Sequence, residues 1–364
     1  MHTETSQRAM LSGIWRGSRL AGRLRGAWRH EADEALKPVR KDVRRLATEV
    51  ERLRAALEQT AIRAARGDRA SAQVRSIMEL NESQRDRLVD LPALLDEQQL
   101  RAHVSHAIST AALRSDPFEH IVVDPLFPPA VYDLLISAIP PAAFFDDHDP
   151  IKPNLVFPMT FGPTLSTTVW NAVDTMIARQ CIQPAVLEKF HQPLQHHYDT
   201  VFGPAFRAQA NALPKLSDGG RLMLRRSGYH LAAHRDPKRS MLTCLMYLAR
   251  PGDDERHGTQ LFRVTDDREA SYKQTYYPGA DGGTCELATV VPFRPNTMLV
   301  FLNAHGAHGA TIPADAGEDL ERYSYQFYVA PENAALGTLI RQLPQDRRTM
   351  WQNKNRVATL KPNA

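Results

Sequence analysis

The residues best suited to chemistry are His234 and Asp236, which lie two positions apart in the segment SGYHLAAHRDPKRS. Side chains two apart on an extended strand point to the same face. One imidazole and one carboxylate are two of the three ligands in the facial triad that holds non-haem Fe(II). Alone the motif is weak, because the chain has 14 histidines and Asp236-Pro237 also suits a surface turn.

A third ligand would have to come from far along the chain. The run FLNAHGAHGATIP, residues 301–313, offers His305 and His308 directly after an apolar stretch that is typical of a buried strand. Gly306 and Gly309 would let the backbone pass close to a metal centre without Cβ clashes. The residue pattern of this run alone does not indicate which of the two histidines would be the ligand.

The strand that follows this run begins with Arg322 and Ser324, which would share one face. A guanidinium can donate two parallel hydrogen bonds to a carboxylate, so this pair suits one end of a dicarboxylate. A buried arginine without an anionic partner would be costly, and a bound carboxylate would offset that cost. The order of candidate ligands along the chain is therefore His-x-Asp, a distal His and then Arg-x-Ser.

The elements that must position these residues are short strands with Gly, Pro, Asp and Asn between them, which favour a sandwich, barrel or jelly roll around a cavity. Strands are predicted at 120–123, 222–226, 240–249, 259–264, 285–293, 296–302 and 322–330. Before them, a helix begun by Pro128-Pro129 and a helical pattern over about 165–204 predict flanking helices. The fold class is α+β.

Composition excludes several classes of protein. Hydrophobic residues make up 43% of the 364 and charged residues 24%, as in ordinary globular proteins. The three cysteines form neither a disulfide framework nor a zinc pattern, and a reducing cytoplasm is the simplest setting. No apolar run long enough to span a membrane and no secretory signal is evident. No basic stripe with interleaved aromatics marks the body, so nucleic acid is not an expected partner.

The basic character belongs to the N-terminal segment, where residues 1–70 hold 16 Lys and Arg against 9 Asp and Glu. Residues 8–30 could form an interfacial helix on an anionic membrane or a solvated, loosely ordered tail rich in glycine. Apolar residues in steps of four and three predict a heptad helix that either self-associates or packs on its own domain. They are Val39, Val43, Leu46, Val50, Leu53 and Leu57. Gly67-Asp68 is expected to end or bend that helix.

Taken together, these motifs resemble the 2-oxoglutarate- and Fe(II)-dependent dioxygenases, and within them the prolyl-4-hydroxylase-like branch. The resemblance covers roughly 116–330 and includes the opening DPFEHIVVDPLFPPAVYDLLISAIP and the spacing Gly228-x-x-Leu231-x-x-His234-x-Asp236. It implies His234, Asp236 and His308 as iron ligands. It further implies that Arg322 and Ser324 bind the distal carboxylate of 2-oxoglutarate, and that Tyr247 contacts that co-substrate.

The chain also departs from the family's pattern. Arg225 stands where a co-substrate-binding tyrosine is often found, three residues before the glycine. The distal His and the Arg are usually about ten residues apart, whereas here Arg322 follows His308 by 14 and His305 by 17. The extra residues ADAGED resemble an exposed loop insertion. The shorter gap and the context His308-Gly309-Ala310 favour His308 over His305.

The implied activity is hydroxylation of an organic substrate by O2, with decarboxylation of 2-oxoglutarate to succinate and with ascorbate as a supporting reductant. The substrate could be a peptidyl side chain, a glycan or a small metabolite. Candidate contacts are Arg263, Tyr272, Tyr276 and Tyr277, although each could equally be a packing or loop residue. The alternative is an iron-free jelly-roll protein that binds a ligand or assembles through its coiled coil.

The expected organisation has three parts. Residues 1–84 form a basic segment with the heptad helix at about 39–66, a docking or oligomerisation device that would make the protein peripheral to a membrane if it binds lipid. Residues 85–338 form the oxygenase domain, with helical support before about 220 and a jelly-roll core at about 221–332. Residues 339–364 are a polar C-terminal tail.

Overall fold

The computed structural model describes residues 41, 44–45, 47–61, 63–146 and 148–353, in two compact units, Met1–Ser71 and Ala72–Ala364. In the first unit the backbone is helical over 47–61 and 63–71, so of the two predicted outcomes for Gly67-Asp68, an end or a bend, the helix does not end there. Val50, Leu53 and Leu57 are exposed, and the earlier heptad positions and residues 8–30 lie outside the described residues. Self-association and lipid contact therefore stay predictions. No helix in the described part is long and apolar enough to cross a membrane.

The second unit starts before the predicted boundary at 84/85. Residues 72–83 are helical, and the side chains of Gln73 and Gln84 donate to the carbonyls of Ala143 and Ser137 at 2.8 and 2.9 Å. These bonds join this stretch to the body of the unit. Helices α2 (Arg87–Leu94) and α3 (Glu97–Thr110) follow. The side chain of Asp96 caps α3.

Two antiparallel sheets form the centre of this unit. The larger has the order β1 (His120–Val123), β8 (Met298–Leu302), β5 (Leu242–Tyr247), β10 (Arg322–Pro331), β3 (Lys215–Arg225) and β2 (Asn154–Val156). The smaller has the order β4 (His230–His234), β9 (Ala307–Thr311), β6 (Thr259–Asp266) and β7 (Thr284–Val291). Strands β3 to β10 thus alternate between the sheets, except that β6 and β7 are neighbours in the smaller sheet, which is the strand order of a jelly roll. The α+β class is confirmed.

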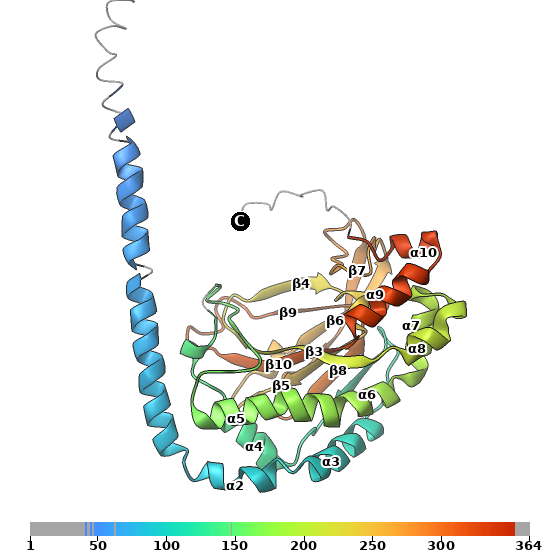
Figure 1. Cartoon of the computed structure of the whole chain (residues 1–364), viewed down its shortest axis with the longest axis horizontal. Coiled ribbons are helices and arrows are strands. Elements are labelled where there is room, and N and C mark those ends of the chain that lie inside the picture. Colours follow the sequence, from blue (N-terminus) through green and yellow to red (C-terminus); the bar gives the residue numbers. More distant parts are fainter. Residues whose placement is uncertain (1–40, 42–43, 46, 62, 147, 354–364) are drawn as a thin grey trace, which may run out of the picture. The chain divides into compact units, whose positions relative to one another are not determined.

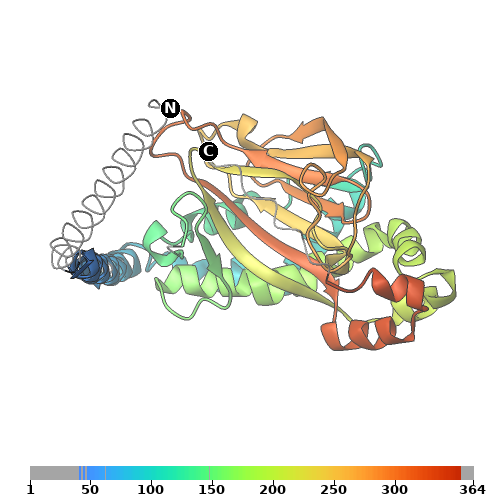
Figure 2. The same ribbon diagram turned by 90° about the horizontal axis from the view of Figure 1, so that it is seen from above.

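The two faces of the larger sheet have different partners. Its outer face packs on helices, where Trp170, Val173 and Ile177 are fully buried against strand residues such as Tyr325. Figures 1 and 2 show these helices running along that face. The inner face packs on the smaller sheet through a second apolar cluster, which is composed of Phe118, Met223, Leu245, Tyr247, Ala249, Leu261, Val291, Phe293, Leu299 and Phe301. The inner face also carries polar side chains, and these form the candidate site.

The flanking helices occupy the predicted region. They are α4 (Pro129–Ser137), α5 (Thr164–Ala172), the π-helix η2 (Val173–Ile182), α6 (Gln183–Lys189), α7 (His191–Val201) and α8 (Arg207–Ala212). Pro129 begins α4 because its missing N–H needs no partner in the first turn. The wide turns of η2 end just before Pro184, which cannot donate to an α-helical ladder.

The C-terminal part differs from the predicted polar tail. Helices α9 (Asn333–Gln342) and α10 (Gln345–Thr349) continue the fold beyond residue 338. Leu339, Leu343 and Trp351 are buried in the main core, and Trp351 stacks on Phe202 with ring centroids 5.1 Å apart. Three apolar anchors spread over 13 residues are too sparse for a clear periodic signal, which is why this stretch resembled a tail.

Candidate metal centre and its cavity

Three side chains with metal-binding atoms meet between the two sheets. His234, Asp236 and His308 are buried, and their ligand atoms all lie within 4.8 Å of one another. Asp236 is 3.8 Å from His234 Nε2 through Oδ1 and 3.9 Å from His308 Nε2 through Oδ2. The imidazole centroids are 4.1 Å apart. This is a two-histidine, one-carboxylate set that can occupy one face of a metal ion.

Strand pairing brings the two histidines together. His234 ends β4 and lies directly opposite His308 on β9, after a register shift that follows Leu231. A bulge of this kind changes the direction of the side chains after it. Gly309 lies beside the bulge, where a Cβ would be only 2.7 Å from the carbonyl oxygen of Leu231. The close approach that was predicted for the glycines is therefore an approach to neighbouring chain atoms.

His305 lies away from this group. Its side chain is exposed, and its ring centroid lies 6.3 Å from that of His196. His308 instead packs on Phe301 at 4.6 Å. Burial lowers the pKa of His308 to about 3, so the imidazole is neutral at physiological pH and can donate a lone pair to a metal. The geometry favours His308 as the distal ligand.

Two hydroxyl groups hold the carboxylate of Asp236. Thr243 on β5 donates to Oδ2 at 2.8 Å, and the Tyr328 hydroxyl on β10 approaches Oδ1 at 3.4 Å. The side-chain amide of Asn303 donates in turn to Thr243 at 3.0 Å. Hydrogen bonds to a ligating carboxylate fix its orientation and tune its affinity for the metal. Sequence motifs did not reveal these partners, because they come from three separate strands or turns.

Arg322 and Ser324 lie on the inner face of β10, as predicted. Arg322 Nε donates to the carbonyl of His257 at 2.6 Å, and the guanidinium lies 4.5 Å from the ring centroid of Phe293. Its Nη2 and the Ser324 hydroxyl are buried and have no hydrogen-bond partner. Tyr247 packs against Arg322 but donates its hydroxyl to Thr259 at 2.7 Å. Arg322 and Ser324 thus offer unused donors, whereas the Tyr247 hydroxyl is already engaged.

A cavity of about 260 Å³ connects the triad with Arg322. Apolar side chains and several polar groups share its wall. The lining residues are Lys152, Asn154, Arg221, Met223, Arg225, Tyr229, Leu231, His234, Asp236, Thr243, Leu245, Thr259, His308, Gly309, Ala310, Arg322 and Gln326. The volume suits a small dicarboxylate with part of a second molecule.

Arg225, which replaces the tyrosine of the resembled pattern, lies directly opposite Arg322 in the β3–β10 register. It donates to the carbonyls of Pro153 and Leu224 at 3.1 and 2.9 Å and to Asn154 Oδ1 at 3.0 Å. Its guanidinium stacks over Tyr229 at 5.0 Å. All of its recorded hydrogen-bond acceptors are neutral.

Arg221 lies four residues before Arg225 on β3, opposite Gln326, and lines the same wall. Its Nη2 donates to Gln326 Oε1 at 2.8 Å and to the Tyr328 hydroxyl at 3.2 Å. The same hydroxyl approaches Asp236, so Arg221 is one side chain away from the triad. Sequence analysis named neither arginine as a ligand-binding group, because a single Arg in an alternating strand carries no distinguishing signal.

Arg235 is buried and lies between His234, the last residue of β4, and Asp236; its side chain points away from theirs. It pairs with Asp267 at 2.8 Å and with Glu269 at 2.9 Å. It also donates to the carbonyls of Gly306, at 2.9 Å, and of His305. The arginine therefore ties the turn before β9, which leads into His308, to the segment that carries His234 and Asp236.

The proposed substrate-contact residues fall in different places. Tyr277 stacks on His234 with centroids 5.5 Å apart and so lies beside the triad. Tyr276 is buried under Arg235, and Tyr272 packs on Trp351. Arg263 forms an exposed ion pair with Asp116. Among these four, only Tyr277 contacts a candidate ligand.

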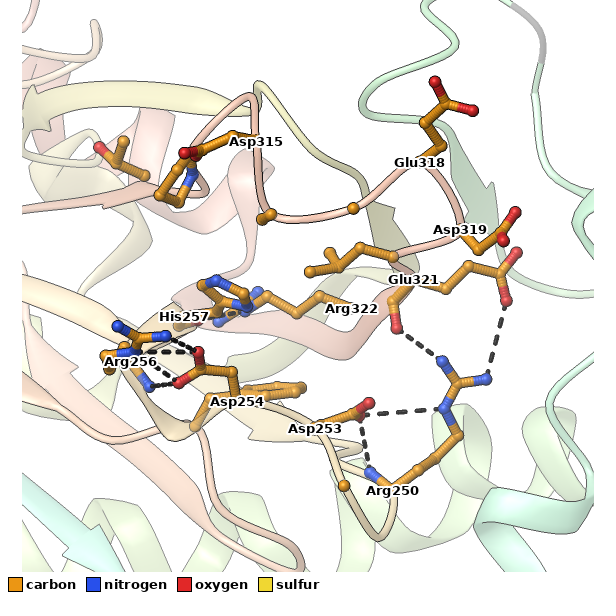
Figure 3. Close-up of a pocket in the computed structure, with 17 residues that line it drawn as sticks. Arg250, Asp253, Asp254, Arg256, His257, Asp315, Glu318, Asp319, Glu321 and Arg322 are labelled. Carbon is orange, nitrogen blue, oxygen red and sulfur yellow. Dashed lines mark hydrogen bonds and ion pairs between the residues drawn. The ribbon is translucent and has the colours of Figure 1, made fainter.

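A second, more open cavity of about 990 Å³ lies on the other side of Arg322, under the 314–319 insertion (Figure 3). Its arginines are paired with acids. Arg250 lies 3.7 Å from Glu321 and 3.9 Å from Asp253, and Arg256 lies 2.6 Å from Asp254. Most of the insertion is exposed, as predicted. The wall of this cavity carries six carboxylates (Asp253, Asp254, Asp315, Glu318, Asp319 and Glu321) against three arginines (Arg250, Arg256 and Arg322), so acids predominate here, in contrast to the inner cavity.

No family model matches the chain, and no curated protein matches it. Solved structures that are similar to it include 2-oxoglutarate/Fe(II) oxygenases, as the motifs led us to expect. A prolyl-4-hydroxylase from Pseudomonas putida is 14% identical, with 64% of this chain and 99% of that chain covered and a TM-score of 0.35. A prolyl hydroxylase from Trichoplax adhaerens, in complex with a hypoxia-inducible-factor peptide, is 12% identical, with 68% and 96% covered and a TM-score of 0.37.

HygX from Streptomyces hygroscopicus, solved with nickel, 2-oxoglutarate and hygromycin B, is 14% identical. The match covers 59% of this chain and 83% of that chain, with a TM-score of 0.35. Similarity at this level assigns neither a family nor a substrate, so the function has to be inferred from the site.

Proposed function

We propose that this protein is a 2-oxoglutarate-dependent Fe(II) oxygenase that hydroxylates an organic substrate. One observation carries the proposal: a buried His-Asp-His set and a buried Arg322 with an unused donor line the same cavity. The first suits a divalent metal with open positions, and the second suits a carboxylate at a distance from it. A dicarboxylate that binds the metal at one end would satisfy both.

The residues present fit these two groups. Two imidazoles and one carboxylate are ligands that Fe(II) accepts, and the Thr243 bond keeps the Asp236 carboxylate oriented. Arg322 Nη2 and Ser324 Oγ are donors without acceptors, which is costly in a buried site and is relieved by a bound carboxylate. Tyr247 would support Arg322 through ring contact, since its hydroxyl bonds Thr259.

Bound Fe(II) with O2 would supply the oxidative decarboxylation of 2-oxoglutarate to succinate and the transfer of one oxygen atom to the substrate. The protein's own part is positioning. His234, Asp236 and His308 would hold one face of the metal and leave the other open. Met223 and Leu245 are buried apolar side chains of the cavity wall and would help to exclude water from the bound groups.

Paired histidine variants test the metal site. The full chain is loaded anaerobically with Fe(II), desalted and assayed for bound iron. We expect His308→Ala to lose the iron and His305→Ala, three residues away, to keep it. The reverse result would mean that His305 is the ligand. Retention of iron by both variants would mean that the triad does not hold the metal.

Binding of labelled 2-oxoglutarate to the Fe(II) protein, followed by succinate release with ascorbate present, tests the co-substrate. A screen of peptide, glycan and amino-acid pools then seeks the substrate that raises succinate release. Absence of both metal and 2-oxoglutarate binding would favour the iron-free, ligand-binding alternative. A chain beginning at residue 72, compared with the full chain by sedimentation with and without anionic vesicles, tests docking and self-association of the N-terminal segment.

A further inference from the structure

Two arginines of the inner cavity are not needed by the metal or the co-substrate. Arg221 and Arg225 lie on the same face of β3, with Met223 between them, and all three line the cavity. Arg225 is 7% exposed and Arg221 is half-buried. The hydrogen bonds recorded for their guanidinium groups go to carbonyl, amide and hydroxyl oxygens, all of them neutral.

Several other arginines of the second unit are paired directly with carboxylates. Arg235 is buried against two carboxylates, and Arg250 and Arg256 pair with acids in the open cavity (Figure 3). Within the described residues, neither Arg221 nor Arg225 has a carboxylate within 4.0 Å. A buried charge without a counter-ion is costly, and burial lowers the pKa of Arg225. An anion at this wall would remove that cost.

If the proposed function holds, bound 2-oxoglutarate does not carry enough negative charge to balance all the positive charge of the inner cavity. Fe(II) on Asp236 leaves one positive charge at the metal, and Arg322 adds another. The two carboxylates of 2-oxoglutarate balance these two charges. Arg221 and Arg225, which line the same cavity as the triad, then remain without a counter-ion.

We propose that the substrate carries an oxyanion, a carboxylate or a phosphate, that Arg221 and Arg225 bind while Arg322 binds 2-oxoglutarate. Planar guanidinium groups bind oxyanions through paired hydrogen bonds, which gives both affinity and orientation. Arg221 lies one side chain from Asp236, so the bound oxyanion lies close to the metal. Lys152 at the rim is paired with Asp149 at 3.3 Å, so the unpaired positive charge of this wall is that of Arg221 and Arg225. Neutral and cationic molecules are selected against.

The test uses inorganic phosphate as the probe and the full chain loaded with Mn(II) and saturating 2-oxoglutarate, without oxygen. Phosphate that binds near Mn(II) shows faster phosphorus relaxation. We expect Arg221→Gln and Arg225→Gln each to weaken phosphate binding by about tenfold, since each removes charge-assisted hydrogen bonds. Affinity for 2-oxoglutarate should change less than about twofold, because its partners are unchanged. Acetate in place of phosphate, measured by competition, tests the carboxylate arm.

Two further variants complete the design. Arg256→Gln removes a paired, exposed arginine from the open cavity and should leave phosphate binding unchanged. Arg225→Lys keeps the charge and should retain most of the binding, which separates loss of the site from loss of folding. If Arg225→Gln weakens 2-oxoglutarate binding about tenfold and spares phosphate, Arg225 serves the co-substrate and the proposal is overturned.

Failure of the proposed function gives a different pattern. A chain that binds neither Mn(II) nor 2-oxoglutarate is titrated with phosphate by calorimetry, which needs no metal. Weaker binding in both glutamine variants would still support an oxyanion site at Arg221 and Arg225. Equal binding in both variants and in the unsubstituted chain would overturn it.

Discussion

Arg322 and Arg225 are cross-strand neighbours that both lack an ion-pair partner but differ in their hydrogen bonds, and replacing each by methionine should therefore change stability to different extents. Arg322 has one buried nitrogen without a partner and one bond, to the carbonyl of His257. Losing that bond costs about 1–3 kcal/mol, while removing a buried unpaired charge returns several kcal/mol. We expect Arg322→Met to leave the free energy of unfolding unchanged or to raise it by about 2 kcal/mol.

Arg225 donates three hydrogen bonds to neutral acceptors, each of them worth about 1 kcal/mol net. Both substitutions remove a buried charge without an ion-pair partner, but Arg225→Met loses two more hydrogen bonds than Arg322→Met does, so we expect it to have a free energy of unfolding about 2 kcal/mol lower than that of Arg322→Met. Urea unfolding, followed by tryptophan fluorescence with a chelator present and no 2-oxoglutarate, measures both variants. Arg322→Met should also weaken 2-oxoglutarate binding about 10- to 100-fold in the metal-loaded protein. If Arg322→Met destabilises the chain as much as Arg225→Met does, the unpartnered Nη2 of Arg322 does not destabilise the ligand-free protein, and the reasoning is refuted.

Three further outcomes follow from the geometry. Thr243→Val removes the 2.8 Å bond to Asp236 at nearly constant shape, and metal affinity should fall about 10- to 100-fold by equilibrium dialysis; unchanged affinity would show that the carboxylate needs no support. Gly309→Ala places a Cβ against the Leu231 carbonyl, and thermal unfolding should show a loss of about 1–3 kcal/mol. Burial lowers the pKa of His197 in the folded chain to about 3, whereas its ordinary value is 6.5. Between these two pH values only the unfolded chain protonates His197, so stability falls as the pH is lowered. The stability of His197→Phe relative to the unsubstituted chain should therefore improve by about 2 kcal/mol between about pH 7 and about pH 5; a constant difference would contradict this.

Much of the sheet structure could be predicted because its strands alternate or are uniformly apolar. The strand predicted at 120–123 coincides with β1, and the run at 322–330 differs from β10 by one residue. The three-residue edge strand β2 has no such pattern and was missed. It matters for the site because its Asn154 accepts a hydrogen bond from Arg225.

The candidate site was predictable where spacing carries information and not where it depends on tertiary contact. His-x-Asp is a local pattern, and the distal histidine could be chosen by its distance from Arg322. The support for Asp236 comes from Thr243 and Tyr328, whose positions depend on how β5 and β10 pair. The cationic wall depends likewise on the register that sets Arg225 opposite Arg322.

The middle residue of the His-x-Asp motif has a consequence for how accurately the metal ligands can be held. A sequence pattern treats this position as a wildcard, yet Arg235 is 1% exposed and joins the turn before β9 to the strand that carries His234. Any slip of one strand against the other would stretch these bonds. Residues 234–236 thus supply two candidate ligands, His234 and Asp236. Through Arg235 they also limit how far the third, His308, can move. A variant that changes only Arg235 would keep the His-x-Asp motif in its sequence, but the three ligand side chains would be held less accurately relative to one another.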